Sequence, residues 1–275
     1  MNTSALDPVM QLRDVSFAYR GGVRVIDGVT ADVQPGVLHA VIGPNAAGKS
    51  TLIRLMLGQL RPAAGQVRIG GTAIHRLDHR RRAAWISYVP QSAGGGAPAF
   101  AYSVWEVVKM GRFALPDDNA AVARAIEVCE LGDLLHRMFD ELSAGQQQRV
   151  LLARAMAQAG GQGRLVLLDE PTSALDLAHV HRTMAHLRRL SEGGMAVVAV
   201  LHDINLAARY ADRVWVLDRG RLVGEGSWRE VLTPPRLNAV YGVRITQVGE
   251  SSAAPGGERR PVFQAEPITA SIAGA

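Results

Sequence analysis

The sequence has a single cysteine, Cys129, and only two lysines, Lys49 and Lys109, among its 275 residues. One cysteine cannot form a disulfide within the chain, which is typical of a protein in a reducing compartment. No apolar run approaches the roughly 20 residues that a membrane-spanning helix requires. Residues 1–9 lack the basic start and apolar centre of a secretory signal. We therefore expect a globular protein held together by its apolar core.

Aromatic residues make up only 5% of the chain. The net charge of the chain is +5. A basic surface can attract nucleic acid or an anionic membrane. The densest basic cluster, residues 80–82, is short, and Trp85 is the only aromatic side chain near it. Proteins that bind single-stranded nucleic acid usually combine such clusters with several aromatic side chains on which the bases stack. The composition therefore predicts no nucleic-acid partner.

Apolar strand-like segments alternate with helical ones over most of the chain. Alternation of this kind predicts an α/β fold with a largely parallel sheet covered on both faces. Residues 9–42 read as short strands and turns. The later strands are expected at 37–42, 165–169 and 195–201, and the helices at 49–60, 177–190 and 204–210.

Two regions depart from that alternation. Residues 92–150 begin with a glycine-rich stretch at 92–96 and then show helical spacing at 104–111, 120–130 and 146–158. We interpret them as a helical subdomain inserted into the core domain of residues 9–241. Residues 214–223 read as a hairpin. The extension, 242–275, is expected to be partly flexible, with one late hairpin that pairs 243–248 with 261–265.

The segment Gly43-Pro44-Asn45-Ala46-Ala47-Gly48-Lys49-Ser50 fits the phosphate-loop pattern G-x-x-x-x-G-K-[ST]. Its glycines allow main-chain N–H groups to turn towards phosphate oxygens. Lys49 adds a positive charge, and the following helix offers its N-terminus to the anion. Ser50 supplies a hydroxyl for Mg²⁺. The pattern, placed between a strand and a helix, predicts a nucleoside triphosphate site.

Two carboxylates end the apolar strand at 165–169. A buried carboxylate is costly unless it is paired, so Asp169 is expected to meet Mg²⁺. The alternative is that Asp169 only caps the next helix. Glu170 follows it and is the best candidate to orient or deprotonate the attacking water. This pair predicts hydrolysis of the bound nucleotide.

Leu142-Ser143-Ala144-Gly145-Gln146 resembles the LSGGQ signature of ABC ATPases, and the resemblance extends from about residue 9 to residue 240. It implies a P-loop NTPase core with an N-terminal antiparallel β subdomain. It also implies that ATP and Mg²⁺ bind between two copies of the chain, with the signature of one copy closing on the nucleotide of the other. Ser143 and Gly145 would therefore face the γ-phosphate held by the opposite copy, and Ala144 and Gln146 belong to the same nucleotide-binding set.

The resemblance assigns further site residues. Tyr19 takes the place of the aromatic that stacks on adenine, and Thr51 belongs to the nucleotide-binding set. Gln91 looks like the glutamine that touches Mg²⁺ and the attacking water. Asp176 lies in the loop that crosses the interface between copies, and His202 matches the histidine that contacts the γ-phosphate.

Two residues depart from the family pattern. Ala46 stands where the family commonly has glycine, and alanine would cost about 1 kcal/mol if that position needs a positive φ. Ala144 replaces the first glycine of the usual LSGGQ motif, and we expect little effect because alanine is the smallest alternative.

Residues 104–112 and 202–212 resemble the ATP-binding subunits of importers for iron–siderophores, haem and cobalamin. Residues 174–179 and the spacer at 160–163 are most similar to those of haem importers. The resemblance implies two transmembrane permease subunits, a periplasmic binding protein and a place at the cytoplasmic face of a bacterial inner membrane. Siderophore or cobalamin import is the alternative, and a soluble ABC-type ATPase acting on nucleic acid is a more distant one. Phe100, Tyr102 and Trp105 either face the permease or pack in the helical core.

Overall fold

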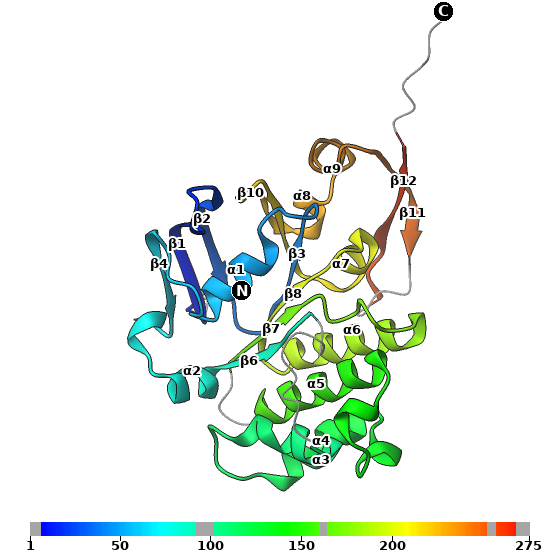
Figure 1. The fold of residues 1–275 in the computed structure, drawn as a ribbon. Helices are drawn as coiled ribbons and strands as arrows, with labels where there is room; N and C mark the ends of the chain where they lie inside the picture. The colour runs from blue at the N-terminus through cyan, green and yellow to red at the C-terminus, as the bar shows by residue number, and fades with distance from the viewer. Residues whose placement is uncertain (1–6, 92–101, 160–163, 252–256, 268–275) are drawn as a thin grey trace, which may run out of the picture.

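The computed structural model describes residues 7–91, 102–159, 164–251 and 257–267, which form a six-stranded, a four-stranded and a two-stranded sheet with helices between them (Figure 1). The six-stranded sheet has the order β10-β9-β3-β8-β7-β6. All of its strands run parallel except β10 at one edge. The strands are β3 (Leu38–Ile42), β6 (Ile86–Val89), β7 (Leu165–Asp169), β8 (Ala196–Val200), β9 (Arg213–Asp218) and β10 (Arg221–Ser227).

The parallel sheet separates two apolar clusters. Successive side chains of a strand point to opposite faces, so Ala40 joins one cluster and Val41 the other. One cluster also holds α5, α6 and α7, and the other holds α1 and the N-terminal strands. The four helices are α1 (Lys49–Met56), α5 (Ala144–Ala159), α6 (Leu177–Glu192) and α7 (Ile204–Tyr210). The predicted sheet with both faces covered is confirmed.

The predicted N-terminal antiparallel sheet is also confirmed, with the order β2-β1-β4-β5. The strands β4 and β5 and the helix α2 were not predicted, because these short segments carry little periodicity of their own. The elements are β1 (Met10–Ala18), β2 (Arg24–Val33), β4 (Ala64–Ile69), β5 (Thr72–Ala73) and α2 (His79–Trp85).

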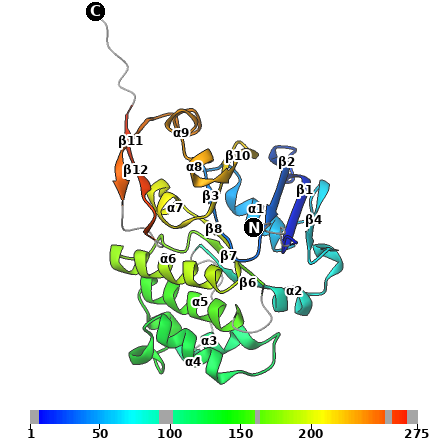
Figure 2. The ribbon, with the colours of Figure 1, turned by 180° about the vertical axis from the view of Figure 1, so that it is seen from behind.

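Helix α1 ends at Met56, four residues before the predicted end. Gly58 adopts φ +67°, a left-handed conformation that commonly ends a helix. Helices α3 (Val104–Lys109) and α4 (Asn119–Val128) lie beside α5 in both views (Figures 1 and 2). Helix α5 runs past residue 150, and residues 92–101 lie outside the described part of the chain.

Beyond β10, the chain forms α8 (Trp228–Val231), α9 (Pro234–Tyr241) and the two-stranded sheet of β11 (Arg244–Ser251) and β12 (Arg260–Glu266). The pairing of β11 with β12 confirms the predicted late hairpin. Figure 2 shows this sheet beside α7, apart from the six-stranded sheet. None of the helices in the described ranges is both long and apolar enough to reach across a lipid bilayer.

Candidate nucleotide site

The phosphate loop lies between β3 and α1, as the sequence predicts. Ala46 adopts φ +62° and Gly48 adopts φ +104°, so the position that departs from the family pattern does require a left-handed backbone. The ammonium of Lys49 donates hydrogen bonds to the carbonyl oxygens of Gly43 and Pro44, both at 2.8 Å. Lys49 is 6% exposed, and its burial lowers the pKa of its ammonium. The buried ammonium of Lys49 is therefore bound by the main-chain carbonyl groups of the loop itself.

The turn between β9 and β10 contacts the phosphate loop. The N–H of Gly220 donates to the carbonyl oxygen of Ala47 at 2.9 Å. Gly220 has φ +78°, and a Cβ there would lie 2.4 Å from the carbonyl oxygen of Val25. The sequence predicted this hairpin but not its contact with the phosphate loop. The Asp-Arg-Gly turn was the available signal, but no local pattern says what a turn packs against.

Asp169 lies beside the phosphate loop at the end of β7. Its Oδ1 accepts a hydrogen bond of 3.2 Å from the hydroxyl of Ser50. Burial raises the pKa of the Asp169 carboxyl, and the charge of Glu170 adds to that shift. Among the described residues, no cationic side chain forms an ion pair with Asp169. A buried carboxylate beside a hydroxyl, both oxygen donors, suits a divalent cation such as Mg²⁺.

Glu170 is the centre of a three-residue cluster. The amide of Gln91 donates to its Oε2 at 2.6 Å, and His202 Nε2 lies 2.5 Å from its Oε1. Gln91 comes from the end of β6, and His202 comes from the end of β8. Glu170 adopts φ +52° and is buried. The carboxyl ends of three neighbouring strands thus bring all three predicted residues together.

Tyr19 follows β1 and faces the first turn of α1. Its hydroxyl lies 3.3 Å from the hydroxyl of Thr51, and Arg54 donates to it at 3.4 Å. Phe17 packs edge-on against the ring of Tyr19 at 4.9 Å. Tyr19 is 42% exposed, so part of its surface is accessible to a ligand near the phosphate loop. We call Tyr19, the phosphate loop, Thr51, Gln91, Asp169, Glu170 and His202 the phosphate-loop half-site.

The signature residues 143–146 begin α5. Ser143 and Gln146 cap the helix reciprocally, because each side chain accepts a hydrogen bond from the other residue's N–H. Ser143 and Ala144 are exposed. A Cβ on Gly145 would lie 3.0 Å from the carbonyl oxygen of Ala174. Within the described ranges, no hydrogen bond or ion pair joins residues 143–146 to the phosphate loop.

Asp176 caps α6 by accepting a hydrogen bond of 2.9 Å from the N–H of His179. The imidazole of His179 also lies 2.7 Å from the other carboxylate oxygen, and the hydrogen bonds from the backbone N–H and then the imidazole of His179 lower the pKa of Asp176. The next residue, Leu177, is 74% exposed. We call residues 143–146 and Asp176 the signature half-site. Ser143 and Asp176 in it face solvent, whereas Lys49, Asp169 and Glu170 of the phosphate-loop half-site are buried.

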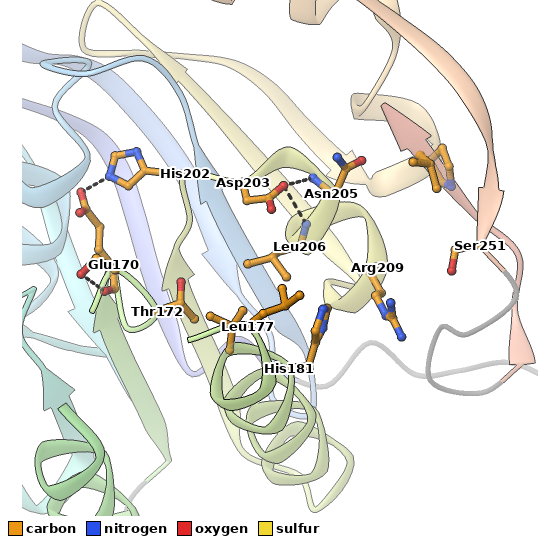
Figure 3. A pocket seen from close by; sticks show the side chains of 14 residues that line it. Glu170, Thr172, Leu177, His181, His202, Asp203, Asn205, Leu206, Arg209 and Ser251 are labelled. Atoms are coloured by element: carbon orange, nitrogen blue, oxygen red, sulfur yellow. Dashed lines mark hydrogen bonds and ion pairs between the residues drawn. The ribbon is translucent and has the colours of Figure 1, made fainter. Parts of the chain in front are cut away.

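A cavity of about 450 Å³ opens beside the Glu170 cluster. Figure 3 shows Glu170 and His202 on one side of it and Ser251 on the other. Leu177 and His181 of α6, together with Leu206 and Arg209 of α7, line the space between them. The cavity thus extends from the Glu170 cluster to β11 and β12.

Three aromatic residues, Phe100, Tyr102 and Trp105, were predicted either to face the permease or to pack in the helical core. Tyr102 and Trp105 are partly buried against the helical core, which agrees with the second of the two predicted roles. Phe100 lies outside the described residues, as does the spacer at 160–163. Phe113, however, is 94% exposed, and Met110 is 38% exposed. These two apolar side chains were not singled out from the sequence.

Comparison with known proteins agrees with this geometry. The family described as "ABC transporter" matches residues 26–173. The hemin import ATP-binding protein HmuV of Pseudomonas entomophila is 41% identical, over 82% of this chain and 90% of that protein. The cobalamin import ATP-binding protein BtuD of Halobacterium salinarum is 42% identical, over 84% of this chain and 58% of that protein.

Among solved structures, an inward-facing conformation of a putative metal-chelate type ABC transporter aligns with a TM-score of 0.76 and 29% identity. The alignment covers 95% of this chain and 98% of that one. The family match and the relatives at about 40% identity extend over the phosphate loop and the Glu170 segment described above. The chain therefore belongs to the ABC transporter family, as an ATP-hydrolysing member.

Proposed function

We propose that this protein is the ATP-hydrolysing subunit of an importer that carries haem across the inner membrane of a bacterium. The observation that carries the proposal is the Glu170 cluster beside a complete phosphate loop, in a chain similar to hemin import proteins along nearly their whole length. Two copies would lie at the cytoplasmic face of the membrane, beneath two permease subunits, with a periplasmic protein delivering the cargo.

The phosphate-loop half-site binds ATP in this proposal. The γ- and β-phosphate oxygens would replace the two carbonyl oxygens that now hold the ammonium of Lys49. Ser50, Asp169 and Gln91 would hold Mg²⁺, which would neutralise charge on the phosphates. The half-exposed ring of Tyr19 would stack on adenine beside Thr51.

Hydrolysis is assigned to Glu170. Its carboxylate is held between Gln91 and His202, and each of its oxygens keeps a further lone pair that can accept a hydrogen bond from an attacking water. Glu170 would then orient this water and accept its proton, while His202 would contact the γ-phosphate. Phosphoryl transfer depends mostly on placement and charge, which these groups would supply.

The second copy would complete the site. Ser143 and Gly145 of one copy would close on the γ-phosphate held by the other, with Asp176 crossing the interface. The exposure of Ser143 and Ala144 at the start of α5 supports this arrangement, because a helix N-terminus favours an anion. ATP would then hold the two copies together.

Closure of the two copies would be transmitted to the permease through the helical region. Met110 and Phe113 follow α3 and expose apolar surface to solvent. Exposed apolar groups of this size mark interaction sites more often than isolated small ones. We assign them to contact with a permease helix, in place of Tyr102 and Trp105.

Haem is favoured over cobalamin because the alignment with the hemin importer relative spans most of that protein, whereas the one with the cobalamin relative spans 58% of it. Cobalamin remains the second candidate, since that relative is equally similar in identity. The cargo itself would be selected by the binding protein and the permease.

Growth of a deletion strain tests the cargo. Deletion should abolish growth on haem as the sole iron source and leave growth on ferrous iron intact, and Lys49→Ala should fail to restore growth on haem. A matched control is Lys109→Ala, which changes the other lysine, outside the phosphate loop. Normal growth on haem together with loss of cobalamin uptake would overturn the haem assignment and leave the importer role in place.

A further inference from the structure

The C-terminal hairpin, which consists of β11 and β12 with residues 257–259 before β12, packs on α7. Both views place the two strands beside this helix (Figures 1 and 2). Ile245 and Phe263 are buried in the same apolar cluster as Leu206. Helix α7 begins two residues after His202. The hairpin therefore contacts the element that carries a residue of the Glu170 cluster.

Asn205 joins the first turn of α7 to β12. Its side-chain amide donates to the carbonyl oxygen of Phe263 at 3.1 Å, and its side-chain oxygen accepts from the N–H of Phe263 at 2.8 Å. A carboxamide offers a donor and an acceptor side by side, so it satisfies both main-chain groups of one strand residue. This double contact fixes both the distance and the orientation of α7 relative to the strand.

Arg260 holds the other end of the same helix. Its guanidinium donates to the carbonyl oxygens of Ala208 and Ala211, at 3.2 and 2.8 Å, which are left without intrahelical partners where α7 ends. Glu258 lies 2.9 Å from its Nε, and the group stacks over the ring of Trp228 at 4.7 Å. Arg260 is 5% exposed, so these partners compensate a buried charge.

His202 depends on α7 for its position. Asp203, the next residue, caps α7 by accepting hydrogen bonds from the N–H groups of Asn205 and Leu206. The side chain of His202 is 48% exposed and borders the cavity of about 450 Å³ (Figure 3). Packing around the ring is therefore incomplete, and the main chain leading into α7 determines where the imidazole lies.

We propose that Asn205 and Arg260 are positioning residues for ATP hydrolysis, which clamp α7 to the C-terminal hairpin and so hold His202 against Glu170. The inference rests on the proposed roles of His202 and Glu170. A displacement of about 1 Å can cost a hundredfold in rate, so loosening α7 should slow the chemical step. The phosphate loop and Lys49 are held by other contacts, so ATP binding should persist.

The test compares kcat with ATP affinity in the full-length protein. Asn205→Ala and Arg260→Ala should each lower kcat about tenfold or more and change the ATP dissociation constant less than about twofold. Arg260→Lys keeps the charge and should recover part of the rate. The matched control is Arg259→Ala, because the side chain of the neighbouring Arg259 is 79% exposed and, among the described residues, forms one ion pair, a 3.9 Å contact with Glu250. It should leave kcat unchanged.

A double-mutant cycle separates positioning from general loosening. If Asn205 acts through His202, adding Asn205→Ala to His202→Ala should not reduce the residual rate further. Multiplied losses in the double variant would overturn the proposal, as would parallel losses of ATP binding and kcat in both single variants. If Arg260→Ala does not fold, Arg260→Lys and Asn205→Ala decide the question.

The same experiment distinguishes this inference from the assignments on which it rests. If His202→Ala hydrolyses ATP at the wild-type rate, the proposed role of His202 fails, and the inference fails with it. If His202→Ala is slow while Asn205→Ala and Arg260→Ala retain the wild-type kcat, only the positioning role is overturned.

Discussion

The phosphate-loop half-site and the signature half-site satisfy their polar groups differently. Lys49, Asp169 and Glu170 are each less than a tenth exposed and find partners within the chain. In the signature half-site, Ser143 is exposed at the start of a helix and bonds mainly to its neighbour Gln146. Burial of unpaired charge is costly, so the first half-site is prepared within one chain. The second leaves polar groups open to solvent, which agrees with the proposed contact with a second copy.

Removal of the Glu170 carboxylate from the phosphate-loop half-site should have the largest effect on ATP hydrolysis. Glu170→Gln keeps the shape of the side chain but cannot accept a proton, so ATP should still bind while kcat falls about 10²- to 10⁴-fold. Steady-state hydrolysis and equilibrium ATP binding would measure this. Glu192→Gln is the control, because its carboxylate is half exposed and its one ion-pair partner in the part of the chain that the structure describes is Arg188, on the same helix α6. Turnover near the wild-type rate would contradict the assignment.

Acid should lower the free energy of unfolding through His39, which lies in the strand that leads into the phosphate loop. Burial, with a smaller contribution from Arg213, lowers the pKa of His39 in β3 from 6.5 to about 3. Its Nε2 accepts a hydrogen bond of 3.2 Å from the N–H of Gln34 and must stay unprotonated to do so. Between these two pKa values only the unfolded chain binds the proton, so stability present above pH 6.5 is lost as the pH falls, by about 1.4 kcal/mol per unit.

Urea unfolding at several pH values between 7 and 4 would check the His39 prediction. His39→Gln keeps a hydrogen-bond acceptor but does not titrate, so its stability should depend less on pH than that of the wild type. The exposed His136→Gln should keep the wild-type slope. Identical pH slopes for the wild type and His39→Gln would show that this histidine is not the source.

A glycine in the phosphate loop should have a smaller effect. Ala46 adopts φ +62°, where a Cβ costs about 1 kcal/mol, so Ala46→Gly should raise the free energy of unfolding by up to about that amount. Ala47→Gly is the control, because Ala47 is buried and has no positive φ, and we expect it to destabilise the protein. Thermal unfolding measures both. An Ala46→Gly variant less stable than the wild type would show that the loop is not strained there.

Local pattern predicted most of the elements that form the phosphate-loop half-site, but not β6, which leads to Gln91. The apolar runs before Gly43 and up to Asp169 predicted two strands of the parallel sheet, between which β8 lies, and the glycine usual at the position of Ala46 raised the question of a positive φ there, which the structure shows. The meeting of Gln91, Glu170 and His202 came from the family resemblance, because these residues are far apart in sequence. They come together only when β6, β7 and β8 pair as adjacent strands of the sheet.

Contacts without a local signature were not predicted. Asn205 and Phe263 lie 58 residues apart, and nothing in the periodicity of either segment indicates that they meet. The same holds for Gly220 and Ala47. A turn or an amide can be recognised from the sequence, but its partner depends on how whole elements pack, which periodicity does not specify.

The central claim is that ATP is hydrolysed between the phosphate-loop half-site of one copy and the signature half-site of another. The most direct test co-expresses Lys49→Ala and Ser143→Arg chains, each of which should be inactive alone. Random pairing makes half of the dimers mixed, and each mixed dimer holds one intact site, so ATP hydrolysis should return to about a quarter of the wild-type rate. If both half-sites acted within one chain, every site would carry one lesion, and the mixture would remain as inactive as either variant alone.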